Sequence, residues 1–562
     1  MSKVDQIAHE YLRSNSALDP NAATSRGNLG HDAELTDYSP SGEEARAQLA
    51  RATLREVEGL SPESERDRLA AEVMRDRLQI EGDIHDSGDW MRGLSVFGPA
   101  TVTSRVFDLM ARDDDHDWEL IAERMEKVPE CLRGIQATLE LGASRRVVSA
   151  RRQAEVAATQ FSTWAGSDSR PGFFRGLAGG YTGSPGQLRS RLSWAALAAD
   201  QAYLGLAEFV EGSYLARARE QDGCGPELYE LSCRLYNGIA IDPVQTYQWG
   251  WEEFASIQAE MAETAERILP GQEMSAVIRL LDTDPGRAIE GERNFQDWNQ
   301  SFLDETMGSL NGTHFDIPGP VQRVEAMLAP PGGSPAMYYT PPAEDFSRPG
   351  RTWYPTLGRT HFPLWTEIAT AYHEGVPGHH LQLGHICWMG DRLNPFQGVL
   401  GLISGHAEGW ALYAERLMGE LGYLENPDYY LGMLANQSFR AARVVVDIGL
   451  HLGLRIPENQ PFHPGETWSR ELAVEFMIRG SGRAREFCLG EVDRYLGVPA
   501  QAISYKLGER VWLEVREEAR RSWGPGFSLK EFHRQALDLG SVGLQQLRQE
   551  MVRPRSDPVA AD

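Results

Sequence analysis

Helix-like spacing of apolar residues is the feature that most constrains the fold of this 562-residue chain. From Glu43 to Gln79 one face is charged, and leucines and valines recur at spacings close to the period of an α-helix. Gly59 and Pro62 lie inside this stretch and predict a break between two helices. Similar patterns recur at 118–141, 145–165, 186–219 and 243–269. No fixed repeat period accompanies them, so the sequence predicts a large, mainly α body that is not a solenoid.

The stretch from Asp316 to Thr360 departs from this pattern. It is rich in proline and glycine, with short β-prone pieces at 336–339 and 352–354. These features predict a small antiparallel β element. Its residues around Tyr339 would offer an edge strand to an extended peptide, because main-chain hydrogen bonds commonly align such substrates. A simple surface hairpin remains the alternative.

Shifts in composition also suggest how the chain is organised. Ser528 with Glu531 forms a capping box that predicts the start of a helix. Pro499 suits the first turn of another helix that runs to about Trp523. The predicted parts are an N-terminal helix with a polar linker at 1–45, a helical part at 46–315, a catalytic part at 316–551 and a flexible tail at 552–562.

Charge and hydropathy exclude several classes of protein. The chain has 55 Lys and Arg against 81 Asp and Glu, a net charge of −26, and no basic run interleaved with aromatics, so nucleic acid is not an expected partner. No apolar window of membrane-spanning length occurs, and no basic segment followed by an apolar stretch opens the chain. We therefore expect a cytoplasmic protein that does not bind membranes. Its five scattered cysteines indicate neither a disulfide framework nor a thiolate metal site. The sequence does not define an oligomeric state.

Histidines gather in one part of the chain, where the segment HEGVPGHH begins at His373. In a zinc hydrolase helix of the H-E-x-x-H type, two imidazoles four residues apart hold the metal, and the glutamate activates water. Here the fourth position is Pro377, and His379 lies six residues after the first histidine, on the opposite face of a straight helix. Proline followed by Gly378 predicts a kink that swings His379 back. His380 is the competing ligand.

A third ligand is needed to leave one position open for water. The segment SGHAEGWALYAE at 404–415 reads as a helix that carries Glu408 and Glu415 on the same face. Seven residues of helix separate the two carboxylates by about 10 Å, so only one of them can be a ligand. Glu408 is the predicted ligand, Glu415 a supporting group or substrate contact, and His406 the remaining alternative.

Five segments carry a family resemblance: HEGVPGHHLQ at 373–382, EGWALYAE at 408–415, RAARVVVDIGLH at 440–451, EVDRYLGVPAQAISYKLG at 491–508 and FHRQALDLGSVGL at 532–544. In these segments the chain resembles the DUF885 family of bacterial proteins, which are related to the gluzincin zinc metallopeptidases. The resemblance implies a mostly helical, metallopeptidase-like fold. The predicted β element precedes the histidine motif in the sequence and is expected beside the active-site cleft. It also implies zinc bound by His373, His379 and Glu408, with Glu374 as the general base.

Two residues are candidates to donate a hydrogen bond to the oxyanion of a hydrolytic reaction, His451 and Tyr505. Arg443, Asp447 and His451 recur every four residues, so a helix would present them in one row, with the aspartate orienting the histidine. A salt-bridged exposed face would give the same pattern. Tyr505 would equally suit a buried ring whose hydroxyl is satisfied.

Three cations are candidates to hold a substrate carboxylate: Arg443, Arg494 and Lys506. An exposed cation is the ordinary role of such residues. A carboxylate anchor would favour short peptides as substrates.

Together these features predict a zinc-dependent hydrolase that cleaves peptide or amide bonds in short peptides or small amide metabolites. One alternative is a biosynthetic amide hydrolase or acyl transferase that acts on one dedicated intermediate. Another is an iron enzyme, which would need carboxylate and histidine pairs from several helices. The last is a helical protein that binds a ligand without turnover, although such a role would not require Glu374 beside His373.

Overall fold

The structure, a computed structural model, describes residues 1–28, 30–167, 169–330, 336–398 and 400–553. The chain forms two compact units, each built from separate segments. The first unit contains Met1–Ser232, Leu450–Leu454 and Leu489–Pro499, and the second contains Cys233–Gly449, Arg455–Cys488 and Ala500–Asp562. The division after residue 232 lies inside the predicted 46–315 part. Most of the predicted tail, 554–562, lies outside the described residues.

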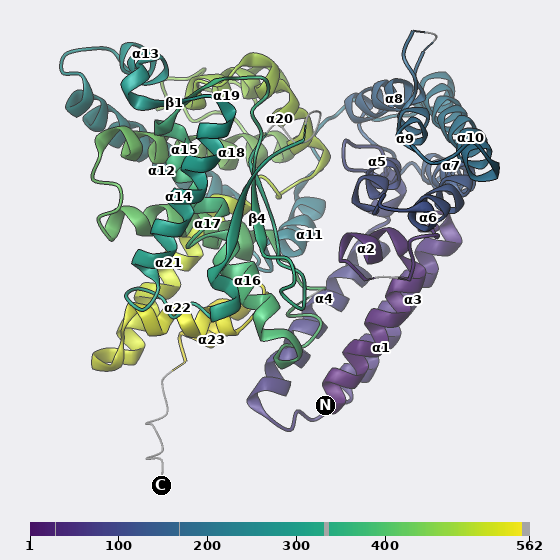
Figure 1. The fold of residues 1–562 in the computed structure, drawn as a ribbon, viewed down its shortest axis with the longest axis horizontal. Helices are drawn as coiled ribbons and strands as arrows, with labels where there is room; N and C mark the ends of the chain where they lie inside the picture. Colours follow the sequence, from purple (N-terminus) through teal and green to yellow (C-terminus); the bar gives the residue numbers. More distant parts are fainter. Residues whose placement is uncertain (29, 168, 331–335, 399, 554–562) are drawn as a thin grey trace. The chain divides into compact units, whose positions relative to one another are not determined.

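The first unit is helical (Figure 1). Its α-helices are α1 (Lys3–Leu18), α2 (Pro20–Ser25), α3 (Pro40–Glu58), α4 (Glu65–Ser87), α5 (Pro99–Arg105), α6 (Asp115–Glu126), α7 (Val128–Arg145), α8 (Arg151–Ala165), α9 (Phe173–Gly179) and α10 (Gln187–Phe209). Short turns of other helix types lie at Asp89–Arg92, Val106–Leu109 and Val210–Tyr214. The gap between α3 and α4 contains Gly59 and Pro62, which confirms the predicted break.

The core of the first unit surrounds α10, which packs against α6, α7, α8 and α9. Phe161, Phe174 and Tyr203 are fully buried there, and the Tyr203 ring contacts both phenylalanine rings. The hydroxyl of Tyr203 donates to the carbonyl oxygen of Ala100 at 2.6 Å, so the polar end of this buried ring is satisfied.

The second unit is also mainly helical. Its α-helices are α12 (Pro243–Ile268), α13 (Met274–Thr283), α14 (Glu292–Leu310), α15 (Leu364–Glu374), α16 (His379–Met389), α17 (Ser404–Glu420), α19 (Arg470–Ser481), α21 (Ser504–Trp523), α22 (Leu529–Asp538) and α23 (Leu544–Met551). Short 3-10 turns lie at Pro285–Arg287, Gly319–Gln322, Gly390–Arg392 and Gly524–Gly526. The helices α11 (Pro226–Asn237), α18 (Pro427–Leu452) and α20 (Arg485–Gly497) contribute residues to both units. The predicted mainly α fold is confirmed.

Two small sheets lie in the second unit, within the described residues. Strands β1 (Ala288–Glu290) and β5 (His361–Pro363) pair antiparallel. The other sheet has the order β2 (Val324–Leu328), β4 (Gly350–Tyr354), β3 (Tyr338–Thr340). β3 pairs antiparallel with β4, with Tyr338 opposite Trp353, whereas β2 runs parallel to β4. The predicted antiparallel element is confirmed, and β3 is an edge strand of its sheet.

Glycines let α17 and α21 approach closely in the second unit. A Cβ on Gly508 of α21 would lie 2.1 Å from the carbonyl oxygen of Gly405 and 2.6 Å from Cα of Gly409. Trp410 and Trp512 are fully buried beside this crossing, with ring centroids 5.0 Å apart. The backbones therefore touch where a side chain would separate them, and this contact fixes the position of the α17 residues between Gly405 and Gly409.

Two predicted helix starts have different outcomes. Ser528 caps α22 and accepts a hydrogen bond from the backbone nitrogen of Glu531, as the capping box predicted. The predicted helix start at Pro499 is wrong, because α21 begins at Ser504. Ala500 adopts a left-handed φ of 62°, and its backbone nitrogen donates to Oδ2 of Asp447 at 3.1 Å. This tertiary bond holds the segment in a turn in place of the first helical turn.

Candidate metal centre

The two halves of the histidine motif lie on separate helices, α15 and α16, with four residues between them. Gly378 adopts φ −74° and ψ −129°, and a Cβ there would lie 2.0 Å from the carbonyl oxygen of His373. Trp410 on α17 donates from Nε1 to the carbonyl oxygens of Pro377 (2.9 Å) and Gly378 (3.2 Å). The predicted kink is confirmed, and a side chain of α17 holds it in place.

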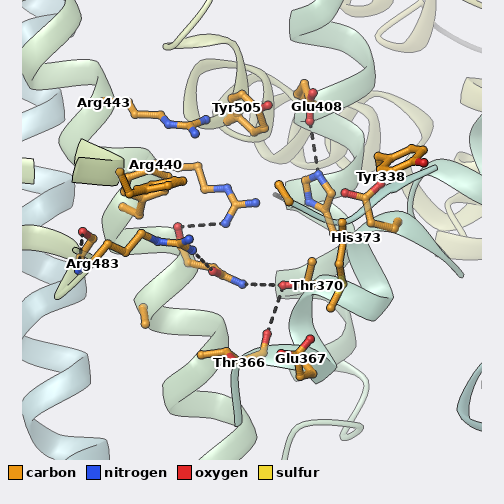
Figure 2. Close-up of a pocket in the computed structure, with 18 of the residues that line it drawn as sticks. Tyr338, Thr366, Glu367, Thr370, His373, Glu408, Arg440, Arg443, Arg483 and Tyr505 are labelled. Atoms are coloured by element: carbon orange, nitrogen blue, oxygen red, sulfur yellow. Dashed lines mark hydrogen bonds and ion pairs between the residues drawn. The ribbon is translucent and has the colours of Figure 1, made fainter. Parts of the chain in front are cut away.

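The kink brings two histidines and a glutamate together. Nε2 of His373 lies 3.3 Å and Nε2 of His379 lies 3.5 Å from Oε2 of Glu408. The imidazole rings are nearly perpendicular, with centroids 4.8 Å apart. One ligand atom from each residue lies within 4.8 Å of the other two. The three predicted metal ligands thus converge from α15, α16 and α17, and Figure 2 shows His373 facing Glu408.

The chemistry of these donors fits zinc. Two imidazole nitrogens and one carboxylate oxygen leave a fourth position open, which is the pattern of catalytic zinc sites. Oε2 of Glu408 is buried between the imidazoles of His373 and His379 and makes no aligned hydrogen bond among the described residues. A buried carboxylate oxygen in this state costs free energy, and a bound cation would satisfy it.

A second carboxylate, that of Glu415, contacts the other ring nitrogen of His373. Oε1 of Glu415 lies 2.8 Å from Nδ1 of His373, and Glu415 is fully buried. Nη2 of Arg440 lies 3.9 Å from the same carboxylate oxygen. Burial alone would lower the pKa of His373, but the carboxylates of Glu408 and Glu415 outweigh it and raise the pKa to about 9. The pocket therefore favours positive charge at this imidazole, and Glu415 holds the ring as a supporting group.

His380, the competing candidate ligand, is hydrogen-bonded to residues outside the group of three ligands. Its Nε2 lies 2.7 Å from the carbonyl oxygen of Val321, and its Nδ1 lies 2.9 Å from the hydroxyl of Tyr339. Burial lowers the pKa of His380 to about 4, so the ring is neutral at ordinary pH. Both ring nitrogens are occupied, and the structure places His379, not His380, beside His373.

Glu374 follows His373 on α15 and lines the same cavity as the three ligands. Burial raises the pKa of its carboxyl, while the imidazoles of His379 and His373 oppose the rise. A buried carboxylate whose pKa is shifted toward neutrality is suited to accept a proton and return it.

A cavity of about 1160 Å³ opens on this group of residues. Met337, Tyr338 and Tyr339 line it from the β3 segment, so the small β element lies beside the site, as expected. Tyr505 and Arg443 also line it. The Tyr505 ring lies nearly parallel to the imidazole of His373, with centroids 6.3 Å apart, and Cζ of Arg443 lies 4.7 Å from the centre of the tyrosine ring (Figure 2).

Lys506 does not line the cavity, although it neighbours Tyr505 in the sequence. Its side chain is buried, with Nζ donating to Oε1 of Gln437 at 2.7 Å. The same nitrogen pairs with the carboxylates of Glu509 and Glu253. These partners place the ammonium in an internal network of the second unit.

Arg494 and His451 belong to the first unit and are not among the residues that line the cavity. Arg494 pairs with Glu491 at 3.0 Å. His451 is buried, where Nδ1 accepts from the backbone nitrogen of Cys224 at 3.3 Å and Nε2 donates to the carbonyl oxygen of Tyr495 at 3.0 Å. His451 also lies two helical turns beyond Arg443 on α18, about 12 Å further along the axis.

The cavity is also lined by charged residues that the sequence analysis missed, among them Arg440, Arg483 and Glu367. Arg440 lies three residues before Arg443 on α18, so helical spacing would have placed the two side by side. Glu367 lies on α15, six residues before His373. Arg483 follows the end of α19, and no pattern in the sequence links it to the histidines.

Glu367 gives a testable dependence of stability on pH. Burial raises its pKa to about 7, opposed by the charges of Arg359 and Arg483. Because the folded state holds the proton more tightly than the unfolded state, this residue costs stability as pH rises from about 4 to 7, and the cost is complete above pH 7. Glu367→Gln should therefore increase the free energy of unfolding at pH 8 by up to about 3 kcal/mol and change it little at pH 4. Urea unfolding at both pH values measures this, and an equal change at the two would contradict it.

Comparisons with known proteins extend over nearly the whole chain. A family model described as "Bacterial protein of unknown function (DUF885)" matches residues 20–551. Among curated proteins, none matches. A solved structure described as a putative lipoprotein from Colwellia psychrerythraea superposes with a TM-score of 0.82 at 23% identity, covering 98% of this chain and 99% of that one. A putative lipoprotein of unknown function from Shewanella oneidensis gives 0.73 at 18%, covering 98% and 100%. At these identities the likeness establishes the fold.

The expected cytoplasmic location is wrong. Two solved structures that share the fold are described as putative lipoproteins, which contradicts that expectation. The expectation depended on finding neither an export signal in the first residues nor an apolar window of membrane-spanning length. The absence of such segments does not fix a location. In the described part of the chain, no helix combines the length and the apolar character needed to span a bilayer.

Proposed function

The chain belongs to the DUF885 family of bacterial proteins, and we propose that it is a zinc-dependent hydrolase, related to the gluzincin metallopeptidases. Its substrates would be short peptides or small amide metabolites, in which it cleaves a peptide or amide C–N bond. One observation carries the proposal: ligand atoms of His373, His379 and Glu408 lie within 4.8 Å of one another, in a cavity that Glu374 also lines.

Glu374 is the general base in this proposal. A zinc ion, when bound by the three ligands, supplies positive charge that activates water and polarises the substrate carbonyl. Glu374 accepts a proton from the attacking water, whose oxygen bonds to the carbonyl carbon. It then gives that proton to the leaving nitrogen as the C–N bond breaks. Its raised pKa suits both steps, because a weaker acid holds the proton between them.

Tyr505 is the proposed donor to the oxyanion. It lines the cavity beside His373, and the positive charges of Arg443 and Arg440 lie over its ring. Such charges favour donation from the hydroxyl and stabilise negative charge that develops nearby. His451 is not included, because its ring nitrogens bond to backbone groups of the first unit.

The size and wall of the cavity favour small substrates. About 1160 Å³ accommodates a short peptide and excludes a folded protein. The edge strand β3 lines one wall and can align an extended substrate by main-chain hydrogen bonds. The hydroxyl of Tyr339 is bonded to His380, so the contribution of Tyr339 would come from its backbone.

Metal binding tests the proposal directly. The purified protein should hold about one zinc ion per chain, and His379→Ala should weaken binding by more than about 100-fold, because it removes a ligand. His380→Gln is the matched control and should keep the metal, because that ring is bonded to Val321 and Tyr339.

Elemental analysis and competition with a chelator measure both effects, with circular dichroism to verify folding. Two histidines and one carboxylate also suit Fe(II), so the metal identity is a further readout. Stoichiometric zinc in folded His379→Ala would refute the zinc hydrolase. Iron bound to the purified protein, together with oxygen consumption, would refute it as well.

A further inference from the structure

Three arginines and two aromatic rings form a continuous strip in the cavity wall. Cζ of Arg440 lies 5.6 Å and Cζ of Arg443 lies 4.7 Å from the centre of the Tyr505 ring. Arg443 also contacts Phe439, as does Arg483, at 4.5 and 4.7 Å. All five residues line the cavity. We call this set the arginine strip.

The arginine strip leads away from the proposed metal centre. Arg440 is its near end, because its Nη2 lies 3.9 Å from the carboxylate of Glu415, which holds His373. Arg483 is the far end, where Nη2 lies 3.4 Å from Oδ1 of Asn436. Figure 2 shows the three arginines on one side of the cavity, with His373 and Glu408 on the other.

Stacking on rings prepares the guanidinium groups to bind anions. A guanidinium over an aromatic face is held by cation–π attraction, and its N–H donors point outward in its own plane. That planar fork matches a carboxylate. Three like charges along one wall repel one another, and this repulsion falls when anionic groups of a ligand lie between them. Four arginines line the cavity, and the three of the arginine strip gather on one side of it, so this wall is the part of the cavity suited to an anionic ligand.

We propose that the arginine strip binds both carboxylates of a dicarboxylic amino acid, so that the substrates are N-acyl or peptidyl amides of C-terminal aspartate or glutamate. This inference rests on the proposed hydrolase function. The α-carboxylate lies between Arg440 and Arg443, the pair that shares Tyr505. The side-chain carboxylate lies between Arg443 and Arg483, the pair that shares Phe439. A C-terminal acidic residue brings two carboxylates to the leaving-amine side of the scissile bond within a single residue.

The reaction is hydrolysis, and water is its only reactant besides the substrate. The oxygen of water bonds to the acyl carbon, the C–N bond breaks, and the nitrogen takes the proton that Glu374 carried. The products are a carboxylic acid and free aspartate or glutamate. The amino acid product keeps both carboxylates, so it should remain bound to the arginine strip after cleavage and should inhibit the enzyme.

Product binding tests the inference without turnover. Calorimetry on the zinc-loaded full-length chain should show L-glutamate binding at least about 10-fold more tightly than L-glutamine, because one charge-assisted pair is lost with the amide. Arg483→Gln should reduce this preference to about twofold or less, and Arg483→Lys should retain part of it. Arg479→Gln is the matched control: this arginine is exposed on α19 and does not line the cavity, so the preference should persist.

Kinetics separate this inference from the proposed function. Values of kcat/KM for N-acetyl-glutamate should exceed those for N-acetyl-glutamine by about 10- to 100-fold. Equal binding of glutamate and glutamine, or unchanged preference in folded Arg483→Gln, would overturn the role of the arginine strip. Selective binding of glutamate without hydrolysis of any amide by the zinc-loaded protein would instead overturn the hydrolase and leave the anion site standing.

Discussion

Glu374→Gln is expected to lower turnover by about 10²–10⁴-fold and to leave the bound zinc in place. Glutamine has nearly the same shape as glutamate but cannot accept the proton of the attacking water. Glu374 is not among the three residues whose ligand atoms converge, so metal affinity should not depend on it. Single-turnover kinetics on an N-acyl amino acid, with zinc content measured on the same sample, gives both quantities.

Glu367→Gln provides the matched control for this experiment. It makes the same chemical change on the same helix and in the same cavity, six residues before His373. Turnover should stay within about threefold of the wild type, because six residues of α15 put Glu367 about 9 Å along the helix axis from His373, where its carboxyl is not placed to take a proton from the attacking water. Full turnover in zinc-loaded Glu374→Gln would show that another group is the base.

Gly508→Ala is expected to lower the free energy of unfolding by about 3 kcal/mol and to disturb the metal centre together with it. The new methyl group would lie 2.1 Å from the carbonyl oxygen of Gly405, and a backbone atom cannot rotate out of its way. α21 must therefore move off α17, which carries Glu408. Chemical denaturation and zinc affinity report the two consequences.

Gly308→Ala is the control for the glycine substitution. Gly308 is exposed in the interior of α14, and a Cβ there meets no atom within 4 Å. Alanine in an open helical position stabilises by up to about 1 kcal/mol, so this variant should equal or exceed the wild type. A Gly508→Ala protein with unchanged stability and zinc affinity would mean that the α17 and α21 crossing tolerates separation.

Local patterns predicted much of the fold because they report local causes. The break between α3 and α4 follows from Gly59 and Pro62, and the start of α22 follows from the side chain of Ser528. The kink at Pro377 and Gly378 was predictable for the same reason, since proline removes a backbone donor and glycine allows a close approach to the carbonyl of His373. The convergence of the three proposed ligands follows from this kink.

Tertiary partners were not predictable from local patterns. Lys506 carries a charge next to Tyr505, yet its ammonium is bonded to Gln437 and Glu509 inside the second unit. The spacing of Arg443 and His451 fits one helix, but a helix of that length carries its two ends into different units. Arg483 reaches the cavity from the loop between α19 and α20, forty residues after Arg443. Such contacts depend on how the elements pack, which helical spacing does not encode.

The segmented construction of the first unit has a consequence for its folding on the ribosome. Gln153 donates to the carbonyl oxygen of Asp493 at 2.8 Å, and Cys224 donates to His451, so early residues bond to late ones. N-terminal domains usually fold first during synthesis, at about 5–20 residues per second. Here the nascent first unit must wait tens of seconds, while residues 233–488 are translated, for the segment Leu489–Pro499 that completes it. Val492, Tyr495 and Leu496 of that segment are buried in the folded chain, so the surface that they cover lies exposed until they are made, and exposed apolar surface of this kind favours aggregation.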